Sequence, residues 1–217
     1  MNRKTFFPFG LIGIAGALMV LSQPDCAKAQ SLSGIRVGDT PSKLSQFGPV
    51  SGEDKYKGLD LFKWVFHNGN SLMATVDAEG EIVYLESDWG GRNDDAGCDL
   101  PGLKFGVTTL AELSKRFGSN GFGFKGRPHI RKTDDGEMLL NSYEVGNVVV
   151  TFYSRINGKD LARLQAENTS GAGSASGAGN GAEDAKLEGI SLANAAYAKS
   201  EWGVRIPNPA YKKVEWK

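Results

Sequence analysis

The sequence predicts an α+β protein made of two tandem repeats, each a short helix packed on a three- to four-stranded antiparallel sheet. Two observations support this fold class. A glycine-bracketed segment occurs twice, and each copy runs into a stretch with helical spacing that ends in Phe-Gly. β-rich runs separated by turn residues then follow each stretch, so each helix is expected to lie on its own sheet.

The repeat is visible in the order of its residues. Gly34-Ile35-Arg36-Val37-Gly38 recurs as Gly102-Leu103-Lys104-Phe105-Gly106, with the apolar, basic and glycine positions in the same order. The helical stretches that follow cover residues 39–48 and 107–118. Each offers only a narrow apolar stripe, and helices this short are not stable without tertiary packing.

Start and stop signals bound the first helical stretch. Asp39 or Thr40 can cap it by accepting a backbone N–H, and Pro41 fits a first turn, where no donor is needed. Gly48 supplies a left-handed end.

The second helical stretch has the same signals and a clearer apolar stripe. Thr108 or Thr109 is the expected cap, and Gly118 the expected end. The stripe consists of Leu110, Leu113 and Phe117, which share one helix face.

Six runs of residues are expected to be strands. Three follow the first helix and three follow the second, with turns at residues 68–70, 78–80 and 146–147 that suit hairpins. The predicted strands are residues 59–67, 71–77, 82–87, 138–145, 148–154 and 186–192.

These elements divide the chain into segments. Residues 1–29 form a predicted signal peptide, 30–95 the first repeat unit and 96–192 the second. The second unit contains a predicted short helix from Gly158 and a flexible Gly/Ala/Ser-rich insertion at about 169–185, whose composition buries little. Residues 193–217 are expected to pack over the body as a C-terminal tail.

The first residues have the pattern of an export signal. Arg3 and Lys4 precede an apolar run over residues 6–21, and Ala27-Lys28-Ala29 places small residues where a signal peptidase cuts. Cleavage after Ala29 predicts a periplasmic or secreted protein with no stable membrane insertion. An uncleaved anchor and lipidation at Cys26 are the alternatives; the first is disfavoured by the short apolar run and the second by the aspartate before the cysteine.

The charge balance does not indicate a nucleic-acid partner. The chain has 25 basic and 25 acidic residues, and loss of the signal peptide would leave 22 and 24. One basic cluster surrounds His129, and we interpret it as a solvated loop and not as a phosphate site. Its members are Lys125, Arg127, Arg131 and Lys132.

No cofactor or metal is expected. His67 and His129 are the only histidines and stand outside any recognisable ligand or catalytic motif. After processing Cys98 would be the single thiol, which permits either a buried cysteine or a Cys98-linked homodimer.

A family resemblance rests on the first glycine-bracketed segment. Residues 34–40, running on to Phe47-Gly48-Pro49, resemble the I-x-x-G-M-T … L-G-x-P signature of the BamE/SmpA lipoproteins and the β-lactamase inhibitory protein. Val76 to Ile82 is similar to a hairpin of the same family. The resemblance implies a helix-on-sheet unit, which the inhibitory protein has twice. Asp39 and Val107 stand where the family has methionine.

We expect a non-catalytic binding protein of the cell envelope whose partner is another envelope protein. Phe62 and Trp64 lie on the strand face away from Leu61 and Val65, and together with Tyr84 they are the candidate binding residues. The alternative is that these aromatic side chains are ordinary core.

A second hypothesis concerns the acidic residues 88–95. Their carboxylates could serve an envelope hydrolase as general acid and base, or could bind calcium. The segment does not match an EF-hand loop, and a polar linker between the repeat units explains it equally well.

Overall fold

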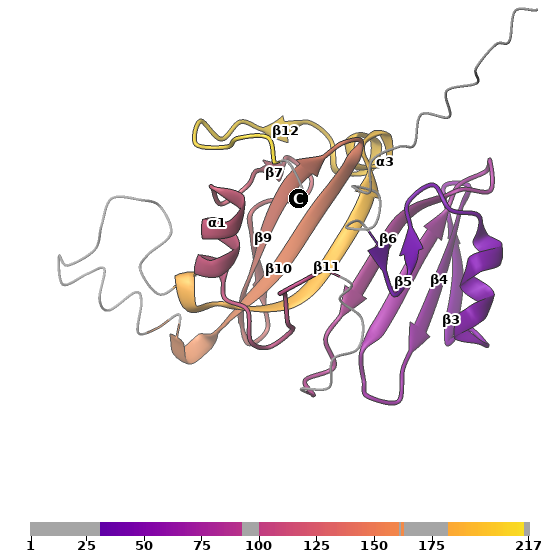
Figure 1. The fold of residues 1–217 in the computed structure, drawn as a ribbon, viewed down its shortest axis with the longest axis horizontal. Helices are drawn as coiled ribbons and strands as arrows, with labels where there is room; N and C mark the ends of the chain where they lie inside the picture. Colours follow the sequence, from indigo (N-terminus) through magenta and orange to yellow (C-terminus); the bar gives the residue numbers. More distant parts are fainter. Residues whose placement is uncertain (1–30, 93–99, 161, 163–181, 215–217) are drawn as a thin grey trace, which may run out of the picture.

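The computed structural model describes residues 31–92, 100–160, 162 and 182–214. An eight-stranded sheet in which every neighbouring pair is antiparallel dominates these residues (Figure 1). Its order is β3-β4-β5-β6-β11-β10-β9-β8. The strands are β3 (Gly52–Tyr56), β4 (Leu59–Val65), β5 (Ser71–Val76), β6 (Ile82–Asp88), β8 (Ile130–Thr133), β9 (Gly136–Val145), β10 (Val148–Asn157) and β11 (Lys186–Asn194). The α+β class and the antiparallel pairing are as predicted.

Strands β3 to β6 form one meander and strands β8 to β11 a second. The expectation of separate three- to four-stranded sheets is wrong, because β6 pairs with β11 and joins both meanders into one sheet. Strand edges with unpaired N–H and C=O groups tend to pair, and this pairing leaves only β3 and β8 as edges. All six predicted strands are present within three residues at each end. β3 and β8 were not predicted.

The remaining described elements are short. Two small two-stranded sheets pair β1 with β2 and β7 with β12, and residues 158–160 are helical, as predicted for the start of that segment. The other elements are β1 (Ser31–Leu32), β2 (Ile35–Arg36), the 3₁₀ helix η2 (Pro41–Phe47), α1 (Leu110–Phe117), β7 (Gly123–Phe124), the 3₁₀ helix η3 (Ala182–Asp184), α3 (Ala195–Trp202) and β12 (Arg205–Ile206).

Helix α1 begins and ends as its sequence predicts. The Thr109 hydroxyl accepts a hydrogen bond from the Glu112 N–H, and the Glu112 carboxylate accepts one from the Thr109 N–H, which completes a capping box. Gly118 ends the helix in the left-handed conformation with φ 72°. The predicted stripe of Leu110, Leu113 and Phe117 is buried.

η2 has the predicted Pro41 in its first turn. Gly48 ends it with φ 73° but ψ −154°, so the left-handed end predicted there is not adopted. The predicted side-chain cap is absent: Thr40 precedes the helix, but its hydroxyl bonds to the Ser42 hydroxyl, 2.8 Å away, and not to the backbone. Asp39 instead accepts a hydrogen bond from the Arg36 N–H.

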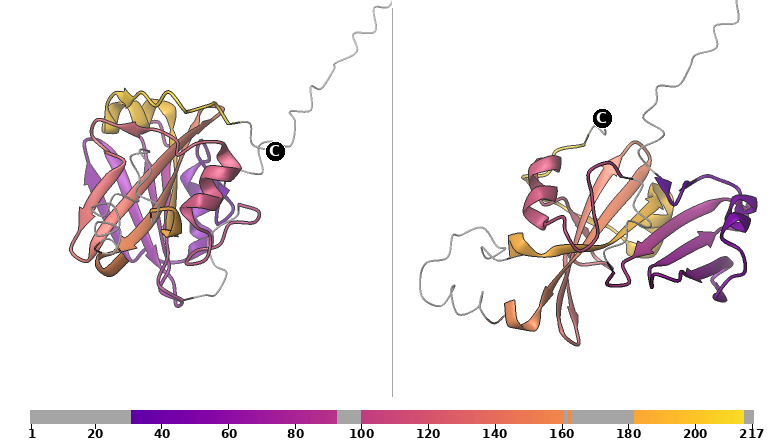
Figure 2. Two further views of the ribbon diagram at one scale, coloured as in Figure 1. Left: turned by 90° about the vertical axis from the view of Figure 1, so that its left-hand side faces the viewer. Right: turned by 60° about the horizontal axis from the view of Figure 1, so that its bottom comes forward.

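The sheet has two differently covered faces. η2 and α1 pack on one, here called the α1 face, and α3 packs on the other, here called the α3 face; Figures 1 and 2 show α1 and α3 on opposite sides of β9 to β11. One apolar core lies on the α1 face and includes residues of both meanders, among them Leu72, Leu85, Phe117, Phe152, Leu187 and Ile190.

Of the C-terminal tail expected over residues 193–217, residues 193–194 belong to β11, and α3 packs on the sheet after them. Trp202 of α3 belongs to a cluster on the α3 face that also includes Phe124, Val149 and Ala198. β12 pairs with β7, so after α3 the chain returns to the segment between α1 and β8.

Candidate functional site

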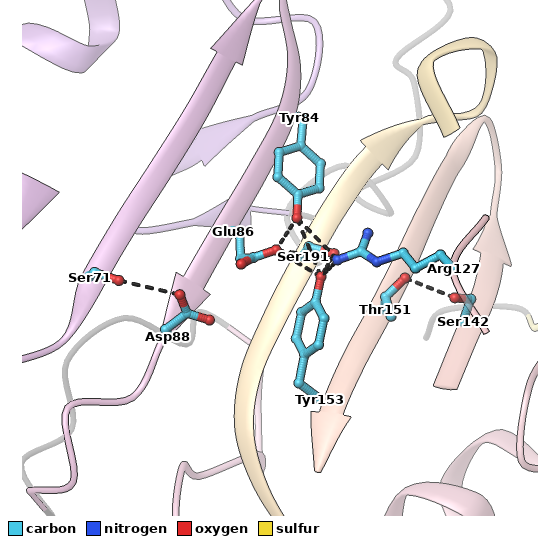
Figure 3. Close-up of polar contacts among 9 residues, drawn as sticks. All are labelled: Ser71, Tyr84, Glu86, Asp88, Arg127, Ser142, Thr151, Tyr153 and Ser191. Atoms are coloured by element: carbon cyan, nitrogen blue, oxygen red, sulfur yellow. Dashed lines mark hydrogen bonds and ion pairs between the residues drawn. The ribbon is translucent and has the colours of Figure 1, made fainter. Parts of the chain in front are cut away.

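A group of polar and aromatic side chains gathers on the α3 face where the two meanders meet (Figure 3). Alternation along β6 places Tyr84, Glu86 and Asp88 on this face. Opposite them in β11 stand Ala193, Ser191 and Gly189. Because these three residues are small, long side chains from β6 and β10 can approach each other across β11.

Four residues surround Glu86. Its Oε2 accepts hydrogen bonds from the hydroxyls of Tyr84 and Tyr153, the latter at 2.8 Å, and forms an ion pair with Nη2 of Arg127 at 3.4 Å. The Tyr153 hydroxyl also lies 2.8 Å from Oγ of Ser191. We call these five residues the Tyr84 cluster.

The guanidinium of Arg127 is enclosed by aromatic rings. It lies 4.2 Å from the ring centroid of Trp202 and 5.1 Å from that of Tyr153, distances that allow cation–π attraction. The side chains of Arg127 and Glu86 are only 17% and 15% exposed. This partly buried ion pair links the loop after β7 to β6, and the contact with Trp202 links the same loop to α3.

Burial raises the pKa of two side chains on this face, Tyr84 and Asp88. It raises the pKa of Tyr84 well above the ordinary value, helped by the charge of Glu86, so its phenol stays protonated and acts as a donor. The pKa of Asp88 rises to about 6, chiefly through burial and next through repulsion from Glu86. The hydrogen bond from the Ser71 hydroxyl, at 3.4 Å, acts in the opposite direction.

A cleft of about 900 Å³ opens beside the Tyr84 cluster, and we call it the sheet cleft. Its walls combine both signs of charge with apolar surface. Lining residues include Glu86, Asp88, Trp89, Arg127, Arg131, Lys132, Met138, Tyr153, Arg155 and Glu188. Arg155 is paired with Glu188, at 2.5 Å, whereas Arg131 and Lys132 form no ion pair with another residue that the structure describes.

The three candidate binding residues do not share a face. Trp64 is 3% exposed on the α1 face, where its ring lies 5.6 Å from that of Phe47 and its indole N–H donates to the carbonyl of Gly48. Phe62 packs beside it, at 6.2 Å between ring centroids. Tyr84 was expected to join them. In β5, however, Phe62 pairs with Ala74 and Tyr84 pairs with the next residue, Thr75. Successive residues of a strand point to opposite faces, so Tyr84 lies on the face opposite Phe62.

The second hypothesis concerns residues 88–95, of which the structure describes only residues 88–92. Asp88 points into the sheet cleft, whereas Asp94, Asp95 and Cys98 lie outside the described residues. Among the residues that are described, no three His, Cys, Asp or Glu side chains gather as a metal site would require. Calcium binding and a Cys98-linked homodimer therefore stay predictions.

Arg127 is the residue that sequence reasoning missed. It was grouped with Lys125, Arg131 and Lys132 as part of a solvated loop, yet its side chain is largely buried. His129, in the same loop, lies with Nδ1 2.9 Å from the carbonyl oxygen of Leu140. One arginine in a basic loop gives no periodic signal, so only the fold reveals its partners.

No protein-family model, curated protein or solved structure matches this chain. Within the described part of the chain, no helix has the length and apolar character needed to cross a bilayer.

Proposed function

We propose that this protein is an exported, non-catalytic binding module of the cell envelope that holds another envelope protein in its sheet cleft. The observation that supports this most directly is the cleft itself, a cavity of about 900 Å³ on the α3 face with charged and apolar walls. Binding sites of this kind combine apolar contact area with a few fixed polar groups that give specificity.

The chemistry of the cleft favours a segment with charges of both signs. Arg131 and Lys132 offer cations without a partner among the described residues, whereas the wall also contains the carboxylate of Asp88 and that of Glu188, which is paired with Arg155. Such complementarity steers association and sets register more than it adds affinity. The Tyr84 cluster forms a fixed floor, because its members are engaged with one another.

The polar groups of this face are arranged for structure more than for catalysis. Raising the pKa of Tyr84 makes its phenol a poorer nucleophile, and Glu86 already accepts three donors. The hydroxyls of Ser142 and Thr151 bond to each other at 2.9 Å, and that of Ser191 bonds to Tyr153, so a tyrosine or a threonine stands where a serine nucleophile would need a histidine.

We also propose that the two meanders are tandem copies of one unit. Supporting this, η2 precedes β3 to β6 and α1 precedes β8 to β11, and the last strand of each meander pairs with the other. This arrangement agrees with the repeated glycine-bracketed segments and with the resemblance to the BamE/SmpA and β-lactamase inhibitory proteins. The signal peptide predicted from the sequence, with cleavage after Ala29, is the basis for proposing export to the periplasm or beyond.

Site-specific photo-crosslinking tests the cleft. A photoreactive phenylalanine analogue at Arg131 or Met138 would stand in the cleft wall, whereas the same analogue at Lys115 would stand on α1, on the other face. Expressed in the native envelope, the two cleft variants are expected to yield one shared crosslinked protein band that the Lys115 variant lacks. Equal labelling from all three positions, or none from the cleft, would contradict the proposed site.

Mutation of Trp64 would not test binding in the sheet cleft. Because Trp64 is buried among Phe47, Phe62 and Phe66, Trp64→Ala is expected to lower the free energy of unfolding by about 3–5 kcal/mol whatever the partner.

A further inference from the structure

A second cavity, separate from the sheet cleft, lies beside helix α1. It measures about 420 Å³ and is bounded by α1, the edge of β8, the middle of β9 and the beginning of η3. We call it the α1 cavity. Leu110, Leu139 and Ala182 give it a buried apolar floor, whereas Asn120 and Ile130 form part of an exposed rim.

One polar atom in the cavity wall is buried without a partner. Asn141 is 4% exposed, and its side-chain N–H donates to the carbonyl of Asn120 at 2.8 Å, which fixes how the amide is turned. Its Oδ1 then has no hydrogen bond among the described residues. Buried acceptors are rarely left unsatisfied, so this oxygen marks a place where a donor from outside the chain belongs.

Two other polar groups of the wall are already engaged. The Ser114 hydroxyl donates to the Asn120 side-chain oxygen, and Nδ1 of His129 lies 2.9 Å from the Leu140 carbonyl oxygen. The described lining contains no lysine or arginine, and its only carboxylate is that of Glu183. An anionic ligand would therefore find no counter-charge there, whereas a neutral or cationic one would meet no repulsion.

We propose that the α1 cavity binds a small neutral or cationic molecule with a compact apolar body and one N–H or O–H donor, which is directed at Oδ1 of Asn141. The apolar floor takes the body of the ligand, and the fixed amide oxygen selects the donor. A site built around one buried acceptor discriminates strongly against an analogue that lacks the donor, because the acceptor is then left unpaired.

Indole and 1-methylindole form a matched pair of probes, since they share an apolar bicyclic body and differ in the N–H donor. Titration into isotope-labelled protein, followed by NMR, is expected to shift the side-chain amide signals of Asn141 and the backbone amides of Leu110 and Leu139 with indole. 1-Methylindole is expected to bind about fivefold or more weakly, as loss of one hydrogen bond to a buried acceptor implies.

A cavity-filling variant provides the second arm. Ala111→Phe places a ring in the cavity wall while Asn141 itself is left unchanged, and should abolish the indole shifts. Lys115→Phe adds the same ring to an exposed position of α1 outside the wall and should leave them unchanged. Equal affinity for the two probes, or binding that survives Ala111→Phe, would overturn the proposal. So would the absence of shifts with either probe up to its solubility limit, which would mean that solvent alone fills the cavity.

Discussion

Arg127 joins a loop to three elements of the α3 face. Its guanidinium pairs with Glu86 of β6 and lies against Tyr153 of β10 and Trp202 of α3. A partly buried pair of this kind gives modest net stability when intact, but removing one partner leaves a charge without compensation.

We therefore expect Arg127→Ala to lower the free energy of unfolding by about 3 kcal/mol, since Glu86 would be left partly buried and the packing on Trp202 lost. Arg131→Ala removes the same side chain from an exposed position with no ion pair to the described residues and is the matched control, expected to change stability by less than about 0.5 kcal/mol. Urea denaturation of both variants measures the difference. Equal effects would show that Arg127 is no more than a loop residue.

Asp88 makes stability depend on pH. Its pKa rises from 3.8 to about 6 because burial and the charge of Glu86 disfavour its ionised form, so the folded protein binds this proton more tightly than the unfolded chain. The stabilising contribution is complete below pH 3.8 and is lost as the pH rises through about 6.

Asp88→Asn keeps an acceptor for the Ser71 hydroxyl and removes the charge. At pH 7.5 the variant is expected to be more stable than the native protein by about 1–2 kcal/mol, and the gain should vanish towards pH 4. Urea denaturation at a series of pH values checks this. A variant that is less stable at pH 7.5 would show that the ionised carboxylate is favoured by the fold.

Residue positions within a strand were predicted well, but the relation between strands was not. Alternation correctly separated Phe62 and Trp64 from Leu61 and Val65. The face of Tyr84 depends on the register of β6 against β5, which includes an irregularity between Thr75 and Val76. Since β6 has apolar residues on both faces, its own sequence does not fix that register.

At the scale of elements, the two helices on the α1 face start differently. α1 begins with a complete capping box at Thr109, whereas the hydroxyl of Thr40 makes no cap for η2. The same substitution at the two positions therefore has different consequences.

Thr109→Ala is expected to lower the free energy of unfolding by about 1 kcal/mol, because the Glu112 N–H loses its acceptor. Thr40→Ala removes the same atoms without freeing a backbone donor and should change stability by less than about 0.5 kcal/mol. Thermal and urea unfolding of the pair measure both values. A larger loss at Thr40 would show that the Thr40–Ser42 contact holds η2 in place.

The edge strands show why some elements escaped prediction. β3 reads Gly-Glu-Asp-Lys-Tyr and β8 reads Ile-Arg-Lys-Thr, with mostly exposed side chains and no apolar alternation. Short, charged edge strands avoid pairing with other chains. Because their sequences lack alternating apolar residues, a search for hydrophobic periodicity does not predict them. The six interior strands have a buried face and were found.

At the scale of the whole molecule, the apolar core on the α1 face is shared. Leu72 and Leu85 of the first meander belong to the same cluster as Phe152 and Ile190 of the second. β6 and β11 also exchange backbone hydrogen bonds along their pairing. The two meanders are therefore expected to unfold as one cooperative unit, although the repeat in the sequence predicts two.

Native-state hydrogen exchange tests this cooperativity. Amides in the middle of β5 and of β10 are expected to exchange with opening free energies that agree within about 1 kcal/mol, because neither meander keeps its core without the other. Amides of β5 that open at a much lower free energy than those of β10 would show that residues 30–95 unfold alone.

The pairing of β6 with β11 also sets the order in which the chain can complete its fold. β11, one of the two central strands of the sheet, is the last of the eight to leave the ribosome, and α3, which brings Trp202 to the Tyr84 cluster, follows it. A nascent chain that ends before residue 186 lacks the strand between β6 and β10. The two halves can therefore close on each other only after residues 186–194 have been translated.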